Sequence, residues 1–350
     1  MLNNNHAELK INDSLTVVII AKNEEDYIGK CIEYIIYSTR NIIKKDIILI
    51  DSNSTDDTIR IAKKFNIRIF QLRKNWVHTP AAGRYIGFNQ TDSEYILFID
   101  GDSYLMDGFL ERAINYFKAD NRIAAITGKR KDIWYQDGKA IRIIEDMTEI
   151  GNNINRNKYL RGTSIFKSNV LKMVGNYNPY LFSEEEAELS ERILKNGYDI
   201  IEIPYDMIIH NTVPTEYTLK SYYGRIKRNL HLGPGQILRY SLSNYMKSNS
   251  KISRKFIKRL ISGIEYLLWI CLGFLTLIIT ILFKVSFNML YIYMVLSLLI
   301  FIFYCIKLRS TFKALEKISM GILSAYYLVI GFLEKPKDPN KYPTDAIRIV

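Results

Sequence analysis

The sequence predicts an α/β fold with a mostly parallel central sheet, followed by helices that cross a membrane. Short apolar runs rich in β-favouring residues alternate with stretches of helical spacing in the first 200 residues. Each run is nearly all apolar, which is typical of strands buried on both faces of a parallel sheet. Near the C-terminus, two apolar stretches of about twenty residues have the length needed to span a bilayer.

The expected strands and helices follow one another in a regular order. The strands are expected at residues 15–20, 46–51, 67–72 and 95–100, and the helices at residues 24–38, 57–65 and 79–90. In the first of these helices, Ile28, Ile32 and Ile35 share one face, which indicates a helix packed against the sheet. This alternation predicts right-handed βαβ units.

Two carboxylates separated by a glycine close the strand at residues 95–100. Ligands of open α/β sheets bind outside the carboxyl ends of the strands. Because alternate residues of an extended segment point the same way, Asp100 and Asp102 can face one cation, and Gly101 permits a close backbone approach. Such oxygen ligands suit Mg²⁺ or Mn²⁺ shared with substrate phosphates. The alternative interpretation is a polar turn after a buried strand.

Several segments together resemble the motifs of family 2 glycosyltransferases. They are Ile-Ile-Ala-Lys-Asn-Glu-Glu at residues 19–25, Ile-Leu-Ile-Asp-Ser-Asn-Ser-Thr-Asp-Asp-Thr at 48–58, Ala-Gly-Arg-Tyr-Ile-Gly at 82–87, and the Asp-Gly-Asp strand end as the DxD motif. The resemblance implies a GT-A fold, a UDP- or GDP-sugar donor, Mg²⁺ or Mn²⁺ as cofactor, and inversion at the anomeric carbon. No dinucleotide-binding Gly-x-Gly-x-x-Gly motif and no P-loop motif is present.

Carried over by position, the resemblance assigns the donor and the cation to specific residues. Asp51 is expected to contact the base, Glu24 the nucleoside, and Arg84 the base or diphosphate. The full set of expected donor contacts is Ala21, Asn23, Glu24, Asp51, Arg84, Asp100, Gly101, Arg225 and Arg228, and the expected cation ligands are Asp102, Asp100 and His210. Ser52 and Tyr85 depart from the family pattern. Arg225 and Arg228 could alternatively form a basic face against anionic lipid, and His210 could be structural.

The acceptor half of the domain is expected to begin near residue 123. Residues 161–166 resemble the family's acceptor-side strand, which assigns Arg161, Gly162 and Thr163 to the acceptor. Residues 184–192 fall where the family has Glu-Asp-x-Asp-Leu-x-x-Arg, so that Glu186 takes the place of the catalytic base, with Glu185 as its rival. The alternative is an acidic first turn favoured by the helix dipole.

The composition changes after about residue 240. We expect a polar extension at residues 1–14, a GT-A domain at 15–240, a basic linker at 241–260, a membrane domain at 261–333 and a polar tail at 334–350. The membrane domain holds spans at 264–283 and 287–306 and a possible third at 318–333. Positive charge before the first span and after the second predicts that both ends are cytosolic. The protein is therefore expected to be a multi-pass protein of the cell membrane.

The net charge of +12 alone would also suit a nucleic-acid-binding protein. Because the basic residues flank the apolar spans, membrane lipid is the expected partner and nucleic acid is not. The sequence thus predicts an inverting, metal-dependent glycosyltransferase at the cytosolic membrane face, which acts on a lipid-linked or glycan acceptor in lipid-linked glycan or cell-surface polysaccharide synthesis. The alternatives are a processive polysaccharide synthase and a non-catalytic membrane scaffold that binds a nucleotide sugar.

Overall fold

The computed structural model describes residues 11–136, 139–145, 153–156, 159–212, 219–248, 254–283 and 288–350. The chain divides into two compact units. The first unit comprises residues 1–181, 185–214 and 337–350, and the second comprises residues 182–184 and 215–336.

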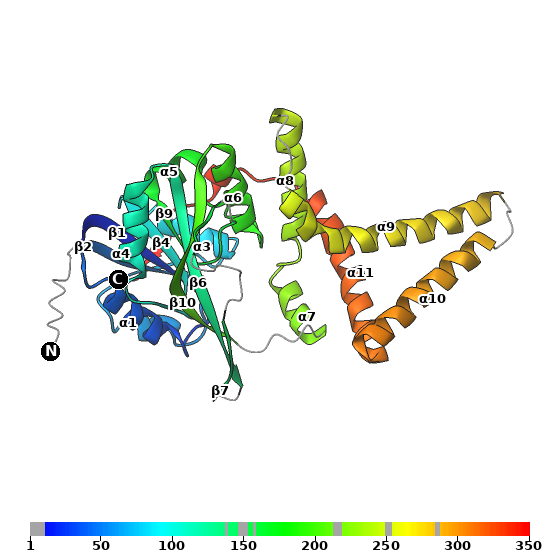
Figure 1. Cartoon of the computed structure of the whole chain (residues 1–350), viewed down its shortest axis with the longest axis horizontal. Coiled ribbons are helices and arrows are strands. Elements are labelled where there is room, and N and C mark those ends of the chain that lie inside the picture. The colour runs from blue at the N-terminus through cyan, green and yellow to red at the C-terminus, as the bar shows by residue number, and fades with distance from the viewer. Residues whose placement is uncertain are drawn as a thin grey trace. The chain divides into compact units, whose positions relative to one another are not determined.

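The first unit contains the predicted parallel sheet. Its leading strands are β1 (Ile11–Ala21), β2 (Ile42–Asp51), β3 (Arg68–Gln71) and β4 (Tyr95–Asp100), and they lie in the order β3-β2-β1-β4 (Figure 1). All neighbours in this group are parallel. Because the strand order reverses at β1, the topological switch point lies between β1 and β4, where ligands of such sheets bind. The predicted α/β fold is confirmed.

The remaining strands make the sheet mixed. They are β5 (Ser103–Leu105), β6 (Ile123–Gln136), β7 (Lys139–Glu145), β8 (Asn155–Arg156), β9 (Ser164–Lys167) and β10 (Asp199–Thr212). β9 is antiparallel to both β4 and β6, whereas β10 is parallel to β6 and antiparallel to β5. The antiparallel β9 therefore joins β4 of the parallel group to β6.

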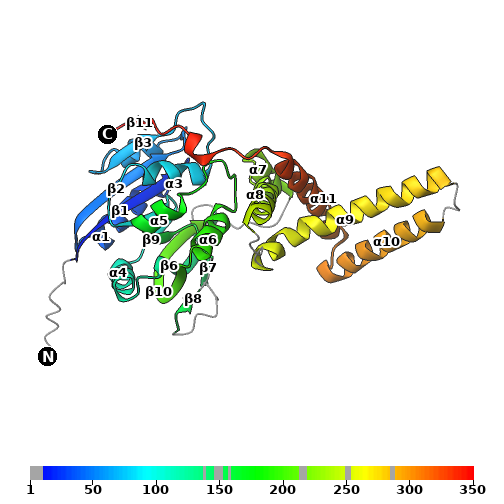
Figure 2. The ribbon, with the colours of Figure 1, turned by 90° about the horizontal axis from the view of Figure 1, so that it is seen from above.

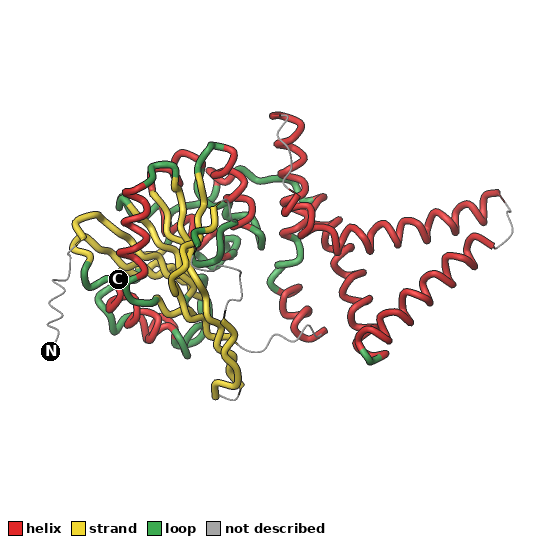
Figure 3. The backbone as a smooth tube through the Cα atoms, viewed as in Figure 1, coloured by secondary structure: helices red, strands yellow, loops and turns green. Residues whose placement is uncertain are grey.

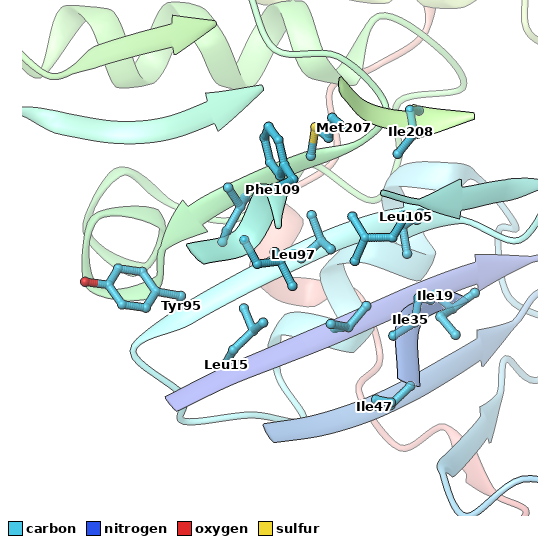
Figure 4. Close-up of a cluster of buried hydrophobic side chains, with 14 of the residues drawn as sticks. Leu15, Ile19, Ile35, Ile47, Tyr95, Leu97, Leu105, Phe109, Met207 and Ile208 are labelled. Carbon is cyan, nitrogen blue, oxygen red and sulfur yellow. The ribbon is translucent and has the colours of Figure 1, made fainter. Parts of the chain in front are cut away.

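Helices cover both faces of the sheet. On β1, Val17 and Ile19 point into one buried cluster, while Val18 and Ile20 point into the other. α1 (Ile28–Ser38) and α4 (Phe109–Ala119) contribute to the first cluster, which Figure 4 shows. The second cluster includes side chains from α3 (Pro80–Phe88), α5 (Ser168–Val174) and α6 (Glu185–Lys195), which are labelled in Figure 2. The short α2 (Thr58–Ala62) adds to the first cluster. Burial on both faces explains why the central residues of β1, β2 and β4 are almost all apolar.

The segment predicted as a polar tail is instead folded into the first unit. β11 (Ile347–Arg348) pairs antiparallel with β3, after the short 3₁₀ helix η1 (Pro339–Lys341). Tyr342 is 3% exposed and its ring meets the rings of Trp76, Tyr85 and Tyr180 edge-on. The prediction failed because one buried aromatic residue and two strand residues are enough to dock a segment that is otherwise polar.

The second unit is helical (Figure 3). It contains α7 (Leu219–Lys227), α8 (Gly233–Ser248), α9 (Arg254–Phe283), α10 (Asn288–Leu308) and α11 (Thr311–Leu333). Three segments of the described residues are long and apolar enough to cross a membrane, namely Gly263–Leu282, Asn288–Leu308 and Thr311–Leu333. The first two coincide with the predicted spans, and the third is longer than predicted.

Two predicted boundaries differ from the structure. The expected end of the catalytic domain at residue 240 lies inside α8, and the expected extension includes residues 11–14, which belong to β1. Residues 1–10 of the extension and residues 249–253 of the expected linker lie outside the described residues.

Candidate active site

Three strand ends bring the predicted donor residues together. In the sheet register, Ala21 lies opposite Asp51, and Ile20 lies opposite Asp100. The amide of Gly101 donates to the carbonyl of Ile20 at 2.9 Å, which extends this alignment one residue beyond β4. The carboxylates that follow β2 and β4 therefore lie at the same edge of the sheet, on either side of β1.

Asp51 is a buried carboxylate with one free oxygen. Its Oδ2 accepts hydrogen bonds from the amide of Ser54 at 2.9 Å and from Nε2 of Gln71 at 3.0 Å. Its Oδ1 is buried and has no hydrogen-bond partner among the described residues. Because leaving a buried acceptor unsatisfied costs about 1–3 kcal/mol, this oxygen is suited to accept an N–H from a ligand.

Asn23 and Glu24 shape the loop after β1. Asn23 has a φ of 59°, and its Oδ1 accepts from the amide of Thr55 at 2.8 Å, which fastens this loop to the loop after β2. The amide of Glu24 donates to Oγ1 of Thr58 at 2.8 Å. Burial, and then the carboxylates of Asp102 and Asp100, raise the pKa of Glu24 to about 8. Asn23 thus positions the loop, and Glu24 lies close enough to Asp100 and Asp102 for their negative charges to raise its pKa.

Arg84 connects the two halves of the site. The side chain is fully buried on α3, and its guanidinium donates to Glu185 Oε1 at 2.9 Å, to Asp100 Oδ1 at 3.1 Å and to the carbonyl of Gly162 at 3.1 Å. The ring of Tyr177 lies 5.4 Å from the guanidinium carbon. Although burial disfavours a charge, the surrounding carboxylates raise the pKa of Arg84, so this residue is a fixed cation.

Gly162 leaves open the space between these charged groups. A Cβ at this position would lie 3.0 Å from Asp100 Oδ2, 3.5 Å from Arg84 Nη2 and 3.8 Å from Glu186 Oε1. The predicted acceptor-side residue therefore faces both the donor carboxylate Asp100 and the predicted base Glu186. Any larger residue here would crowd the carboxylate of Asp100 and the guanidinium of Arg84.

The glutamates at the start of α6 have different surroundings. Glu185 is buried against Arg84, and burial followed by the neighbouring Glu186 carboxylate raises its pKa. The Glu186 side chain is 22% exposed and its Oε1 lies 3.7 Å from Nη2 of Arg84. Glu188 binds Arg192 at 2.7 Å through both of its oxygens. Only Glu186 of these three combines partial exposure with proximity to Asp100 and Gly162.

His210 on β10 joins Asp102 to a second carboxylate. Its Nε2 lies 3.2 Å from Asp102 Oδ2, and its Nδ1 lies 2.9 Å from Asp132 Oδ1. Arg130 donates from Nε to the same Asp132 oxygen at 2.7 Å. Burial opposes a charge on His210, but the hydrogen bonds that its ring donates to the carboxylates of Asp102 and Asp132 raise its pKa overall. Asp132 thus orients the ring so that Nε2 faces Asp102.

The metal prediction can be compared with this geometry. Within the part of the chain that the structure describes, there is no cluster of three or more His, Cys, Asp or Glu side chains able to hold a metal. Asp102 and His210 offer two donor atoms, while Asp100 has one oxygen engaged by Arg84. Two protein ligands fit Mg²⁺ or Mn²⁺, because these ions commonly complete their shell with water and substrate phosphates. A metal role for Asp100 stays a prediction.

Four predicted residues have other surroundings. Arg161 forms an ion pair at 2.7 Å with Glu202, which is fully buried, and Thr163 is buried beside Gly162. Arg225 and Arg228 belong to the second unit, at the end of α7 and just after it. Their assignments to acceptor and donor stay predictions.

Sequence reasoning missed several residues that hold the site in place. Gln71 donates a hydrogen bond to Asp51, the ring of Tyr177 makes a cation–π contact with Arg84, and Asp132 orients His210. Tyr177 could have been found because residues 174–178, Val-Gly-Asn-Tyr-Asn, resemble a Val-Gly-Gly-Phe-Asp turn of family 2 glycosyltransferases, which has an aromatic residue at this position. Gln71 and Asp132 carry no local signal, because each acts on a residue from a different strand.

The chain is similar in sequence to known glycosyltransferases. Residues 16–176 match the model of the family described as Glycosyl transferase family 2. Glycosyltransferase AglE of Haloferax volcanii is 22% identical over 267 residues, which cover 75% of this chain and 81% of that protein. Poly(ribitol-phosphate) beta-glucosyltransferase of Bacillus spizizenii is 30% identical over 124 residues, which cover 34% of this chain but only 19% of that protein. The crystal structure of S. aureus TarS 1-349 in complex with UDP-GlcNAc covers 67% of this chain and 73% of that chain, with 18% identity and a TM-score of 0.46.

Proposed function

Since the chain carries a family 2 glycosyltransferase domain at residues 16–176, we propose that it transfers a sugar from a UDP-sugar to an acceptor held at a membrane, with inversion at the anomeric carbon. The free oxygen of Asp51 is the observation that supports this most directly. The oxygen lies at the carboxyl end of β2, next to the switch point where ligands of such sheets bind.

The state of Asp51 favours uracil over guanine. Its Oδ2 already accepts two hydrogen bonds, which leaves Oδ1 as a single acceptor. Uracil presents one ring N–H between two carbonyl groups, which matches one free oxygen. Guanine presents a ring N–H beside an exocyclic amine, and this pair needs two acceptor oxygens side by side. A GDP-sugar would therefore leave one guanine donor without a partner at this carboxylate.

The sugar would be transferred between Asp100 and Glu186, across the space that Gly162 leaves open. Glu186 accepts the proton of the acceptor hydroxyl while the oxygen of that hydroxyl attacks the anomeric carbon, from the face opposite the diphosphate. The bond between that carbon and the diphosphate oxygen breaks at the same time, which inverts the configuration. Arg84 keeps Asp100 and Glu185 in place throughout, because it binds both.

Asp102 and His210 would hold Mg²⁺ or Mn²⁺ against the departing diphosphate. A divalent cation bound there supplies positive charge that stabilises the leaving group. Asp132 contacts Nδ1 of His210 and so keeps Nε2 of the ring directed toward Asp102. Asp102 and His210 would thus hold the cation, which would supply positive charge to the diphosphate of the donor.

The acceptor is proposed to be attached to a membrane lipid or to a growing cell-surface glycan. Among the described residues, three helices of the second unit are long and apolar enough to cross a membrane, and helices of this kind would keep the enzyme where such acceptors reside. Relatives include an enzyme that by its name acts on poly(ribitol phosphate). Lys307, Lys313 and Lys317 follow the apolar part of α10, which supports a cytosolic catalytic side.

A donor screen tests the proposal. The purified full-length protein would be incubated with UDP-glucose, UDP-N-acetylglucosamine and GDP-mannose, each with Mn²⁺ and with EDTA, and thermal stabilisation and sugar release would be measured. We expect a UDP-sugar to stabilise and turn over only with the cation, and Asp51→Asn to lose this response. Asp57→Asn, which changes an exposed carboxylate that binds Arg60, is the matched control. Stabilisation by GDP-mannose alone would contradict the base assignment, and full turnover in EDTA would contradict the cation.

A further inference from the structure

The path of the chain restricts how its apolar helices can lie in a membrane. Residues before the helices and residues after them belong to one folded unit, because residues 337–350 are part of the first unit. β11 pairs with β3 through Ile347 opposite Gln71 and Arg348 opposite Phe70. The hydroxyl of Tyr342 donates to the carbonyl of Val77 at 2.7 Å. The chain therefore leaves this unit, enters the membrane helices and returns to the same unit.

An even number of crossings follows from this path. A mixed α/β sheet with open edges and polar loops cannot lie inside the hydrocarbon region, because its backbone groups would lose their hydrogen-bond partners there. The first unit thus lies wholly on one side of the bilayer. If α9, α10 and α11 all crossed, residues 337–350 would emerge on the opposite side from β3. At most two of the three helices can cross.

The helix that does not cross is identified by charge and length. α9 has no charged residue after Glu265, and α10 has none before Lys307. α11 carries Lys313, Glu316 and Lys317 in its first two turns. The apolar remainder of α11, residues 318–333, rises about 24 Å, whereas the hydrocarbon core is about 30 Å thick.

α11 has two apolar faces that differ in their neighbours. One face is buried against the rest of the second unit, with Gly331 placed so closely that a Cβ would lie 2.2 Å from the carbonyl oxygen of Leu232. The opposite face forms an exposed stripe along the whole helix, because its members recur at helical spacing. They are Phe312, Leu315, Ile322, Tyr326, Ile330 and Leu333.

We propose that α9 and α10 cross the membrane as a hairpin, and that α11 lies in the plane of the membrane in the leaflet next to the first unit. The exposed stripe of α11 faces the acyl chains of that leaflet. Lipid is the occupant because α10, an apolar helix with no buried residue, is separated from α11 by only Arg309 and Ser310. An apolar stripe of this kind on a charged, non-spanning helix is typical of interfacial helices.

Labelling of single cysteines in the full-length protein tests this arrangement. In a background with Cys271→Ala and Cys305→Ala, the remaining Cys31 is fully buried in the first unit and is not expected to label. One further cysteine is introduced at a time by Lys63→Cys, Asn288→Cys, Thr311→Cys or Lys335→Cys. Sealed vesicles of each orientation are treated with a membrane-impermeant maleimide. Lys63 is exposed on the first unit and reports its side. We expect positions 63, 311 and 335 to label from one side and position 288 from the other.

Each other labelling pattern contradicts the proposal. Positions 311 and 335 on opposite sides would show that α11 crosses. Position 288 on the same side as position 63 would show that α9 and α10 do not form a spanning hairpin. Spin labels at Leu315, Ile322 and Ile330 give a second measurement from oxygen and nickel-chelate accessibility. An in-plane helix places all three at a similar shallow depth, and a result with Ile322 much deeper than the other two would overturn the proposal.

Discussion

Nη1 of Arg84 lies 2.9 Å from Oε1 of Glu185, and this buried pair joins α3 to α6 beneath the candidate active site. The same guanidinium reaches Asp100 at 3.1 Å. One cation on α3 therefore sets the distance between the strand that ends in the DxD motif and the helix that carries the predicted base.

Replacing Arg84 with Gln should strongly destabilise the protein. The change leaves Glu185 buried without its cation, and removing one partner of a buried ion pair typically costs about 3–5 kcal/mol. Chemical unfolding of the detergent-solubilised protein measures this. The double variant Arg84→Gln/Glu185→Gln should recover part of the lost free energy of unfolding, since position 185 then holds no buried carboxylate without a cationic partner. Arg60→Gln, which removes an exposed ion pair with Asp57, should change the free energy of unfolding little. An equal loss of unfolding free energy in Arg84→Gln and Arg60→Gln would contradict the prediction.

Glu186→Gln should lower kcat by about 10²-fold or more at saturating donor, because it removes the proposed proton acceptor. Glu185→Gln should mainly lower the free energy of unfolding, because Glu185 is engaged by Arg84. Glu188→Gln is the matched control on the same helix, where the lost carboxylate binds Arg192 and not Arg84. Measurement of kcat across pH separates the outcomes. If Glu185→Gln is the variant that loses kcat, the base is Glu185, and if neither does, an acceptor that is already ionised becomes the better interpretation.

Tyr342→Ala should lower the free energy of unfolding by about 3–5 kcal/mol, the usual cost of deleting a buried aromatic ring. Tyr342→Phe should cost about 1 kcal/mol, since only the hydrogen bond to Val77 is lost. Asp345→Asn alters an exposed ion pair with Arg73 in the same segment and serves as the control. A truncation near Tyr240, which would remove the membrane helices, should also be unstable because it removes Tyr342. A fully stable truncated protein would contradict this role of the C-terminal segment.

The stability of the first unit should fall as the pH rises from about 4.5 to about 8 in EDTA. The pKa of Glu24 is raised from 4.5 to about 8 in the folded protein, chiefly by burial. The folded state then holds this proton more tightly than the unfolded state, so the stabilisation is complete below pH 4.5 and is lost above pH 8. The melting temperature of Glu24→Gln should decline less across this range than that of the wild type. Glu25→Gln, at the exposed neighbouring position, should behave like the wild type. Equal declines of the melting temperature in the wild type, Glu24→Gln and Glu25→Gln would contradict the assignment of this pH dependence to Glu24.

The sequence by itself determined the strands, the helices between them and the carboxylates at the strand ends. Apolar runs bounded by Asp51 and Asp100 are local patterns, and a strand buried on both faces has to be apolar along its length. The same holds for α9 and α10, because a span needs an uninterrupted apolar stretch. These features could be predicted since each depends on residues adjacent in the chain.

Only the tertiary structure decided which partners these residues meet. Arg84 and Glu185 are 101 positions apart, His210 and Asp132 are 78 apart, and Tyr342 and Val77 are 265 apart. No local pattern encodes such pairs, because each depends on which strands and helices become neighbours. Tyr85, which departs from the family pattern, shows the same limit. Its ring meets the ring of Tyr342 edge-on, and this contact could not be predicted because folding brings the far end of the chain against α3.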